Sequence, residues 1–458
     1  MASLKIGLEI HGYLSTKEKL FCACKATRHA AKQDLKPNSF ICPICTGSPG
    51  SKPMLPNSEA IKKVLQIALI TNCKINEYSK AKNVLVFQRK HYNWPDLPKG
   101  YQTTISGPYS TEVGVNGEFE KIRIKEVHLE EDPASWNPEA GTIDYNRSGL
   151  PLVEIVTQPD FSSPEQVDMW LKNLILTLSY IKALDKNAGI KADVNVSTSG
   201  ERVEIKNISS LESIRKSIEY EIERQSKEQA TRETRRYDEK TGKTIRMRGK
   251  EQAEDYRFIP DPDLPILKIQ SAEIENLKRQ LPESPAEKLA KLIKKHRVSK
   301  RDAEILYKNL EIVEFFEQVS ERVDPKFALP WVTIELLRVL NYNKKMLDEV
   351  SIDARHFIEL LELVKDKKIT ELKAKQLLNE FIPQSFSPSS KLDKIEVIGK
   401  DKIDEICHQV IKNNKKAVSD FREGKQEALN FLVGEVMKQS NRRADFKTAK
   451  EKLLKLIE

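Results

Sequence analysis

The chain has 458 residues, which is enough for roughly two to four domains, and a hydrophobic content of 39% supplies sizeable cores. The charged content of 32% is high, but apolar residues recur throughout, which excludes a wholly disordered chain. A net charge of +9 is compatible with a nucleic-acid partner without requiring one. No apolar run approaches the ~20 residues of a membrane helix, and the first residues lack an apolar signal core, so we expect a cytoplasmic protein.

Short alternating apolar runs, separated by Pro, Gly and Asn, occupy residues 1–270. Many short strands with few crossover helices favour an antiparallel sheet in an α+β domain. Ser209 and Glu212 match a capping box at the start of an apolar stripe at helical spacing, which predicts a helix from about residue 211 to 222. The predicted strands are Lys5–His11, Glu120–Leu129, Leu152–Thr157, Ala192–Ser197 and Arg202–Lys206.

Helical periodicity and Lys/Glu pairs dominate the rest of the chain. We expect a helical domain over residues 271–394, with a Pro- and Ser-rich linker at its end from Pro383 to Lys394. A small helical tail domain follows over residues 395–458. Solvation explains any single basic residue of this tail, whereas the cluster suggests contacts to a phosphate backbone: Arg422, Lys425, Lys438, Arg442 and Arg443.

Four cysteines form two close pairs near the N-terminus. Cys22 and Cys24 make a C-x-C motif, and Cys42 and Cys45 make a C-x-x-C motif. Paired thiolates suit tetrahedral Zn²⁺, because each pair can occupy one edge of the tetrahedron. The sequence therefore predicts a zinc knuckle over residues 22–45 with a structural role, and four unrelated thiols remain the alternative.

Carboxylates interrupt several apolar strands. Glu9 and His11 point to one face of their strand, about 6.5–7 Å apart. Glu154 and Glu204 repeat the pattern, and an acidic run follows His128. One such Glu would usually face solvent, but several suggest convergence on cations, as a phosphoryl-transfer site requires. Because no P-loop sequence is present, any ATP site would be built from a sheet and metal ions.

Basic and aromatic residues lie near these strands, and Arg suits bidentate phosphate contacts. Arg89 and Lys90 precede an aromatic segment, and Arg147 precedes the Glu154 strand. Surface salt bridges are the alternative explanation for about half of the set. Further arginines surround a turn near Gly242: Arg232, Arg235, Arg236, Arg246 and Arg248.

Many of these motifs, in this order, resemble the B subunit of aspartyl/glutamyl-tRNA amidotransferases, and the resemblance spans the chain. The motifs include Gly-Leu-Glu-Ile-His at residues 7–11, both cysteine pairs, and Trp-Pro-Asp-Leu-Pro-Lys-Gly-Tyr-Gln at residues 94–102. They continue with His-Leu-Glu-Glu-Asp at residues 128–132, Asp-Tyr-Asn-Arg-Ser-Gly at residues 144–149 and Asp-Tyr-Arg-Phe at residues 255–258.

The resemblance implies a cradle like that of glutamine synthetase, in which ATP phosphorylates the side-chain carboxylate of Glu or Asp mischarged on tRNA and ammonia then displaces phosphate. It implies catalytic roles for Glu9, His11 and Glu154, with Mg²⁺ held by these residues and by Glu130 or Glu131. Strand alternation favours Glu130, which shares a face with His128, whereas a bulge would favour Glu131. Further candidates for binding ATP or substrate are Arg89, Lys90, Arg147, Asp193, Asn195, Glu204, Lys206 and Asn207.

The sequence also departs from the family pattern. The family commonly has Ala-Gly-Lys after the Glu-Glu-Asp run, whereas Pro133, Ala134, Ser135 and Trp136 follow here. No amidase nucleophile with Ser and Lys partners is recognisable. The resemblance therefore implies an amidase A subunit that supplies ammonia, and a small C subunit, as partners in a glutamine-dependent carbon–nitrogen ligase.

Three alternatives remain at the level of sequence. The first is the archaeal E subunit, which carries a large inserted domain for which there is no room after Pro265. The second is a non-catalytic zinc-containing RNA-binding protein, which needs no glutamates within strands. The third is a small-molecule ligase of the glutamine synthetase type, which needs no basic tail.

Overall fold

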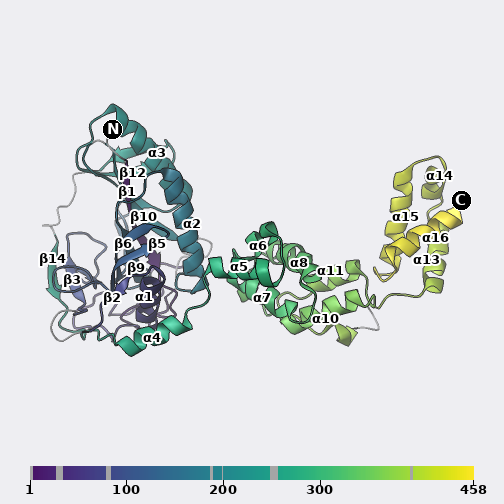
Figure 1. The fold of residues 1–458 in the computed structure, drawn as a ribbon, viewed down its shortest axis with the longest axis horizontal. Coiled ribbons are helices and arrows are strands. Elements are labelled where there is room, and N and C mark those ends of the chain that lie inside the picture. The colour runs from purple at the N-terminus through teal and green to yellow at the C-terminus, as the bar shows by residue number, and fades with distance from the viewer. Residues whose placement is uncertain are drawn as a thin grey trace. The chain divides into compact units, whose positions relative to one another are not determined.

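A computed structural model describes residues 4–26, 35–78, 84–185, 189–198, 200–247, 256–391 and 396–457. The chain divides into two compact units, Met1–Ser284 and Pro285–Glu458. The first unit contains the sheet and the second is helical (Figure 1). This arrangement confirms the predicted α+β first part and helical C-terminal region. Arg248, one of the predicted basic residues, lies outside the described residues.

Twelve strands among the described residues form one sheet in the first unit. Its order is β13-β12-β11-β10-β1-β9-β6-β4-β3-β14, with β5 beside β6 and β2 beside β5. The pairs are antiparallel except for β11 and β12, so the expected antiparallel pairing is confirmed for most of a sheet that is mixed overall. The strands are β1 (Lys5–Tyr13), β2 (Lys74–Ile75), β3 (Gln88–His91), β4 (Gln102–Thr104), β5 (Gly114–Phe119), β6 (Ile122–Glu131), β9 (Pro151–Thr157), β10 (Ile190–Ser197), β11 (Val203–Ile208), β12 (Glu233–Asp238), β13 (Lys243–Arg246) and β14 (Arg257–Pro260).

Four helices of this unit are α1 (Ser58–Ile70), α2 (Pro164–Tyr180), α3 (Leu211–Lys227) and α4 (Ser271–Gln280). Their apolar faces share one core with alternate residues of the strands, such as Ile6, Leu8 and Ile10 of β1. Strand alternation therefore turns the residues between them, including Glu9 and His11, to the opposite face. A separate hairpin, β7 (Ser135–Asn137) and β8 (Thr142–Asp144), follows β6.

Two boundaries differ from the sequence expectation. Helix α3 is capped by Ser210, whose side chain accepts a hydrogen bond from Ser213 N, so the proposed capping box at Ser209 is wrong by one residue. Helix α4 belongs to the first unit, because Ile274 and Leu277 join its core. The first unit therefore extends beyond residue 270.

The second unit contains two separate apolar cores. The first core is built by α5 (Pro285–Lys295), α6 (Lys300–Leu306), α7 (Leu310–Ser320), α8 (Pro325–Pro330), a π-helical segment (Trp331–Leu336), α9 (Leu337–Tyr342), α10 (Ala354–Lys365) and α11 (Glu371–Asn379), with 3-10 turns at Leu347–Glu349 and Pro388–Lys391. The second core is built by α13 (Lys400–Asn413), α14 (Lys415–Arg422), α15 (Gln426–Gln439) and α16 (Phe446–Ile457).

The predicted linker is shorter than its Pro and Ser content suggested. Phe386 packs against the first helical core, and Ser385 Oγ accepts a hydrogen bond from Asp353 N at 2.8 Å. The start of this segment is therefore part of the packed domain, whereas residues 392–395 lie outside the described residues. No helix in the described part of the chain is long and apolar enough to cross a membrane.

Candidate active site

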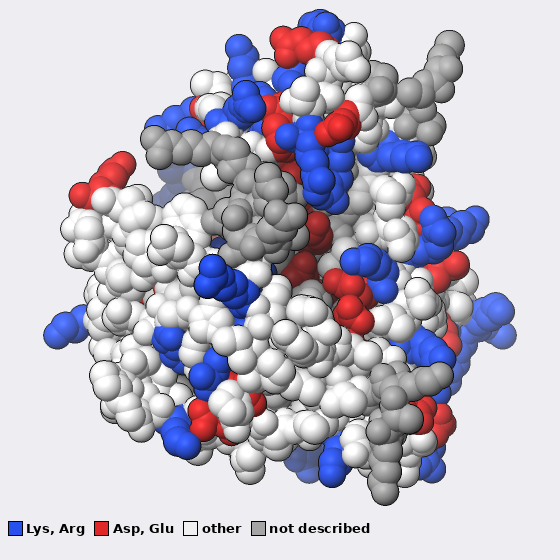
Figure 2. Space-filling view, turned by 90° about the vertical axis from the view of Figure 1, so that its left-hand side faces the viewer, with Lys and Arg blue, Asp and Glu red and all other residues white. Residues whose placement is uncertain are grey.

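The sheet face opposite the helices carries a row of carboxylates on neighbouring strands. The register of β1 with its two neighbouring strands brings these residues together. Glu9 lies opposite Asp193 of β10, and His11 lies opposite Glu154 of β9. On the far side of β9, Glu154 lies opposite His128 of β6. Figure 2 shows a hollow with acidic side chains at its bottom and Lys and Arg side chains at its margin.

The first cluster consists of His11, Glu130 and Glu154, with one donor atom from each residue within 4.8 Å of the others. His11 Nε2 lies 3.5 Å from Glu154 Oε2, and His128 Nε2 lies 2.9 Å from the same oxygen. His128 received no role from the sequence, although its position two residues before Glu130 gave the alternation signal that could have found it.

The pKa values of the residues in this cluster are shifted in different directions. Burial would lower the pKa of His11, but the neighbouring Glu154 carboxylate outweighs it and raises that pKa to about 9. Burial would raise the pKa of Glu154, but His128 and His11 hold it well below its usual range. Burial and the Glu154 charge together raise the pKa of Glu130. The site thus keeps Glu154 ionised between two imidazoles. An added cation would favour the ionised form of Glu130 as well.

The second cluster consists of Glu9, Asp193 and Glu204, again with donor atoms within 4.8 Å of one another. Lys206 Nζ lies 2.8 Å from Asp193 Oδ2 and 3.2 Å from Glu204 Oε1. Burial raises the pKa of Glu9, and the charges of Glu154, Asp193 and Glu204 raise it further. One lysine faces three carboxylates, so the cluster has an excess of negative charge.

Two amides complete the second cluster. Asn195 Nδ2 donates to Glu9 Oε1 at 3.1 Å, and its Oδ1 is buried without a hydrogen-bond partner in the described structure. The Asn207 backbone N–H donates to Asp193 Oδ1 at 2.7 Å. Carboxylate and amide oxygens of this kind are the ligands that Mg²⁺ prefers, so the donor set fits that ion.

Glu131 does not join either cluster. Its Oε1 accepts hydrogen bonds from Thr103 N at 2.9 Å and from Lys99 Nζ. The bulge in β6 lies between Ile124 and Glu126, before the acidic run, so alternation through the run is regular. The structure therefore places Glu130 with His11 and Glu154, and Glu131 on the other side of the strand.

Basic residues near the clusters have different surroundings. Arg89 forms two hydrogen bonds with the buried carboxylate of Asp261, at 3.0 and 3.1 Å, and pairs with Asp263, which fastens β3 to the segment after β14. Arg147 pairs with Asp132 at 3.0 Å. Lys90 Nζ lies 4.6 Å from the centre of the Tyr256 ring. The guanidinium groups of Arg89 and Arg147 are thus paired with carboxylates of the same unit.

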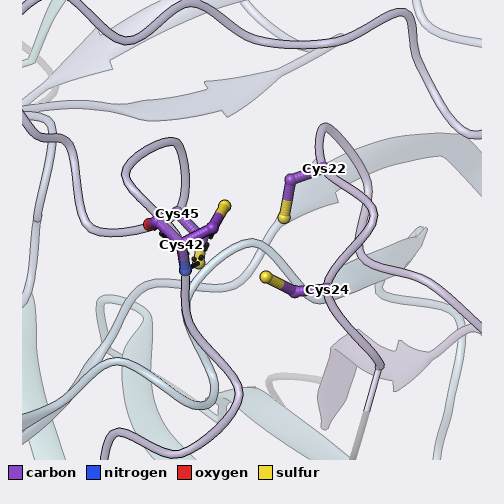
Figure 3. Close-up of side chains that lie close together, drawn as sticks. All are labelled: Cys22, Cys24, Cys42 and Cys45. Carbon is purple, nitrogen blue, oxygen red and sulfur yellow. Dashed lines mark hydrogen bonds between the residues drawn. The ribbon is translucent and has the colours of Figure 1, made fainter.

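The four predicted cysteines lie together on two loops between β1 and α1, with all four Sγ atoms within 4.8 Å of one another. Figure 3 shows the sulfurs of Cys22, Cys24 and Cys42 facing one common space. Cys42 N donates to Cys45 Sγ at 3.2 Å. Hydrogen bonds from Cys22 and from the Cys42 amide lower the pKa of Cys45 to about 5. The arrangement fits a tetrahedral thiolate site for Zn²⁺.

The two loops that carry the cysteines hold neighbouring segments of the first unit in place. Cys45 O accepts from Ser148 Oγ at 2.7 Å, just before β9. Asn38 N donates to Asp144 Oδ1 at 2.9 Å, and Phe40 N donates to Asn146 Oδ1 at 2.9 Å. Gly47 has a φ of +67° and lies so close to Pro98 that a Cβ would meet its carbonyl oxygen at 2.3 Å. The loops thus brace the chain that enters the Glu154 strand.

The basic residues predicted for the tail differ in their contacts within the chain. Arg422 Nε donates to Ile457 O at 3.0 Å, and Arg443 Nε donates to Glu396 O at 2.7 Å. The Arg442 carbonyl accepts from Thr370, and Lys438 lies 3.7 Å from Glu435. Lys425 lines a groove of about 810 Å³, whose other lining residues include Lys415, Lys416, Asp420 and Phe431.

Among the arginines around Gly242, Arg235 belongs to a buried ionic network. Arg235 and Arg224 surround the fully buried carboxylate of Glu221, at 3.2 and 2.8 Å. Arg246 pairs with Glu233 at 3.3 Å, while Arg232 and Arg236 are exposed.

Comparison with known proteins identifies the family. Residues 4–275 match the model of the GatB/GatE catalytic domain, and residues 314–457 match the model of the GatB domain. The chain belongs to the GatB/GatE family. Among curated members of that family, this chain is similar to proteins named as the B subunit of aspartyl/glutamyl-tRNA(Asn/Gln) amidotransferase.

Three of these GatB relatives come from archaea. The protein of Methanothermobacter thermautotrophicus is 41% identical, over 96% of this chain and 97% of its own length. The protein of Methanopyrus kandleri is 40% identical over 97% and 96%, and that of Methanobrevibacter smithii is 42% identical over 96% and 96%. The match over nearly the full length of these relatives does not favour the E subunit alternative.

Proposed function

We propose that this chain is the B subunit of a tRNA-dependent amidotransferase, which activates the side-chain carboxylate of Glu-tRNA(Gln) or Asp-tRNA(Asn) with ATP and amidates it. The observation that carries the proposal is the pair of carboxylate clusters on one open sheet face, in a chain about 40% identical to its GatB relatives. A protein that only binds RNA would not need these clusters: in the second one Lys206 is paired with Asp193 and Glu204 while Glu9 lies beside them, and buried carboxylates without enough cations are costly.

The proposed reaction has two steps. A carboxylate oxygen of the charged amino acid forms a bond to the γ-phosphorus of ATP, and the bond from that phosphorus to the bridging oxygen breaks, releasing ADP. Ammonia then adds to the activated carbonyl carbon, loses a proton, and phosphate leaves with the former carboxylate oxygen. The first step is needed because a carboxylate has a poor leaving group and a charge that repels nucleophiles.

Mg²⁺ would be held by His11, Glu130 and Glu154 and by Glu9, Asp193 and Glu204. When bound, it would offset charge on the transferred phosphoryl group. Lys206, with a side chain 39% exposed, lies beside the second cluster and would contact a phosphate oxygen. Zn²⁺ would occupy the four thiolates as a structural ion. The fold would correspond to the cradle of glutamine synthetase.

The partners follow from the same proposal. An amidase A subunit would supply ammonia, and a small C subunit would join it. The tail, with Lys425 and its neighbouring lysines beside the groove, would contact the tRNA backbone.

The test uses ammonium chloride as nitrogen donor, so that the partner proteins are not required. The full chain is incubated with ATP, Mg²⁺ and either Glu-tRNA(Gln) or Asp-tRNA(Asn), and the amino acid on the tRNA is identified. We expect Gln or Asn to form only with ATP present. Binding of both tRNAs with neither amide formation nor phosphate release would instead support the non-catalytic RNA-binding alternative.

A further inference from the structure

Two of the four tryptophans lie together on the surface of the cradle. Trp170 and Trp331 are 2% and 5% exposed, as expected for large aromatic side chains, whereas Trp94 is 47% exposed. Trp136 is partly exposed, and its ring lies at 62° to that of Trp94 with the centroids 5.8 Å apart. Exposed aromatic pairs of this kind are unusual unless they bind something.

The pair is held by a rigid scaffold. Ala134 N donates to Asp96 O at 2.9 Å, which joins the segment of Trp94 to that of Trp136. Arg147 pairs with Asp132 and donates to Ala134 O at 2.7 Å. On the hairpin, Asn137 Oδ1 accepts from Glu139 N and Ala140 N, at 3.0 and 3.1 Å, and closes the turn. A preorganised aromatic surface loses little entropy when a ligand stacks on it.

The pair lies at the end of the strand that carries Glu130. Trp136 follows Glu130 by six residues, which limits their separation to roughly 20 Å at 3.3 Å per residue. The second carboxylate cluster, with Lys206, spans β1, β10 and β11, whereas β6 is separated from β1 by β9 in the sheet. Phosphates of ATP would favour the side of Lys206, which leaves the end of β6 for the other substrate.

Two basic residues of the neighbouring segments are already paired with carboxylates, which favours an aromatic over an ionic contact for a ligand of this surface. The guanidinium of Arg147 is engaged by Asp132, and the ammonium of Lys99 by Glu131. The exposed parts of Trp94 and Trp136 are aromatic rings, which stack on any base without distinguishing its hydrogen-bonding edge. Unpaired bases next to the reacting amino acid are present at the 3′ end of an aminoacylated tRNA.

We propose that Trp94 and Trp136 form an aromatic platform that stacks an unpaired base of the 3′ end of the charged tRNA. This inference rests on the proposed function and adds to it the place at which the acceptor end is held.

The experiment compares tRNA affinity in a double cycle and does not require catalysis. Dissociation constants are measured for wild type and Trp136→Ala, each with intact tRNA and with tRNA that lacks its three 3′-terminal nucleotides. We expect Trp136→Ala to weaken binding of intact tRNA by about tenfold and to leave binding of truncated tRNA unchanged. Trp136→Phe, which retains an aromatic face, should lose much less.

Several results would overturn the platform. Equal losses for intact and truncated tRNA would mean that Trp136 supports the fold or contacts another part of the tRNA. A rise in the dissociation constant of ATP, with tRNA unaffected, would assign the surface to the adenine of ATP. Circular dichroism of each variant excludes misfolding as the cause. If Trp136→Ala weakens binding of intact tRNA alone and wild type forms no amide, the proposed function fails while the platform stands.

Discussion

Glu154 is the residue at which the electrostatics of the cradle converge. Its Oε2 contacts both His11 and His128, and these contacts keep it ionised despite burial. A glutamine keeps the shape of the side chain but removes the charge on which both imidazoles depend.

We therefore expect Glu154→Gln to lower ATP-dependent phosphate release with charged tRNA by at least about 100-fold, in line with the loss of electrostatic stabilisation by one group. Binding of tRNA, measured by filter retention, should survive. Glu118→Gln, at an exposed position on β5, is the matched control and should release phosphate like wild type. Wild-type turnover in Glu154→Gln would remove this residue from the reaction.

The residues that share a face of one strand were predictable, because alternation depends only on spacing along the chain. Alternation along β1 puts Glu9 and His11 on one face, and alternation from His128 favours Glu130 over Glu131. The registers that set Glu154 opposite His11 and His128 could not be read from the sequence. The engagement of Arg89 by Asp261 was not predictable, because it depends on the pairing of β3 with β14, far apart in the chain. The expected contact of Arg89 with the substrate stays a prediction, and what the structure adds is the bond of its guanidinium to the buried carboxylate of Asp261.

Among the elements of the cradle, the cysteine loops brace the hairpin β7–β8 and the entry to β9. Cys42→Ser should therefore reduce bound zinc from about one ion per chain to nearly none, because a tetrahedral site loses one of its four ligands. Residues 135–149 should exchange amide hydrogens faster in this variant, since Asn38 and Phe40 hold that segment.

Zinc would be measured by mass spectrometry of the metal, and exchange by mass spectrometry of peptides. Cys407→Ala removes a buried thiol from the tail and should leave both readouts of the cradle unchanged. Full zinc content in Cys42→Ser would show that the four thiols are not a metal site.

The hairpin β12–β13 is attached to α3 through Glu221, which is 0% exposed and contacts Arg224 and Arg235. Removing one member of such a buried network leaves uncompensated charges. Glu221→Ala should lower the free energy of unfolding of the first unit by about 3–5 kcal/mol, measured by urea denaturation.

Glu223→Ala provides the comparison on the same helix, because Glu223 and Lys227 are both 68% exposed and such pairs contribute less than about 1 kcal/mol. Equal effects of the two substitutions would contradict the assignment. The parallel pairing of β11 and β12 that brings this network together was not predictable, since residues 203–206 meet residues 233–236 only after α3 returns the chain.

In the molecule as a whole, the tail has an apolar core of its own, from Ile398 to Ile457. A chain that ends at Lys391 should therefore retain the thermal transition of the first unit. We expect its affinity for tRNA to fall by at least about tenfold and its affinity for ATP to remain, because the basic tail would neutralise phosphates. Affinity that is unchanged at several salt concentrations would place the tRNA contacts elsewhere.

If the cradle activates a carboxylate by phosphorylation, one carboxylate oxygen must leave with the phosphate, and an isotope label follows that oxygen. Glu-tRNA(Gln) or Asp-tRNA(Asn) carrying ¹⁸O in the side-chain carboxylate is amidated with ATP and ammonium chloride, and the phosphate released is analysed by mass spectrometry. We expect each phosphate formed with an amide to carry an oxygen from the carboxylate. Amide formation with phosphate that contains no ¹⁸O would contradict activation by phosphorylation.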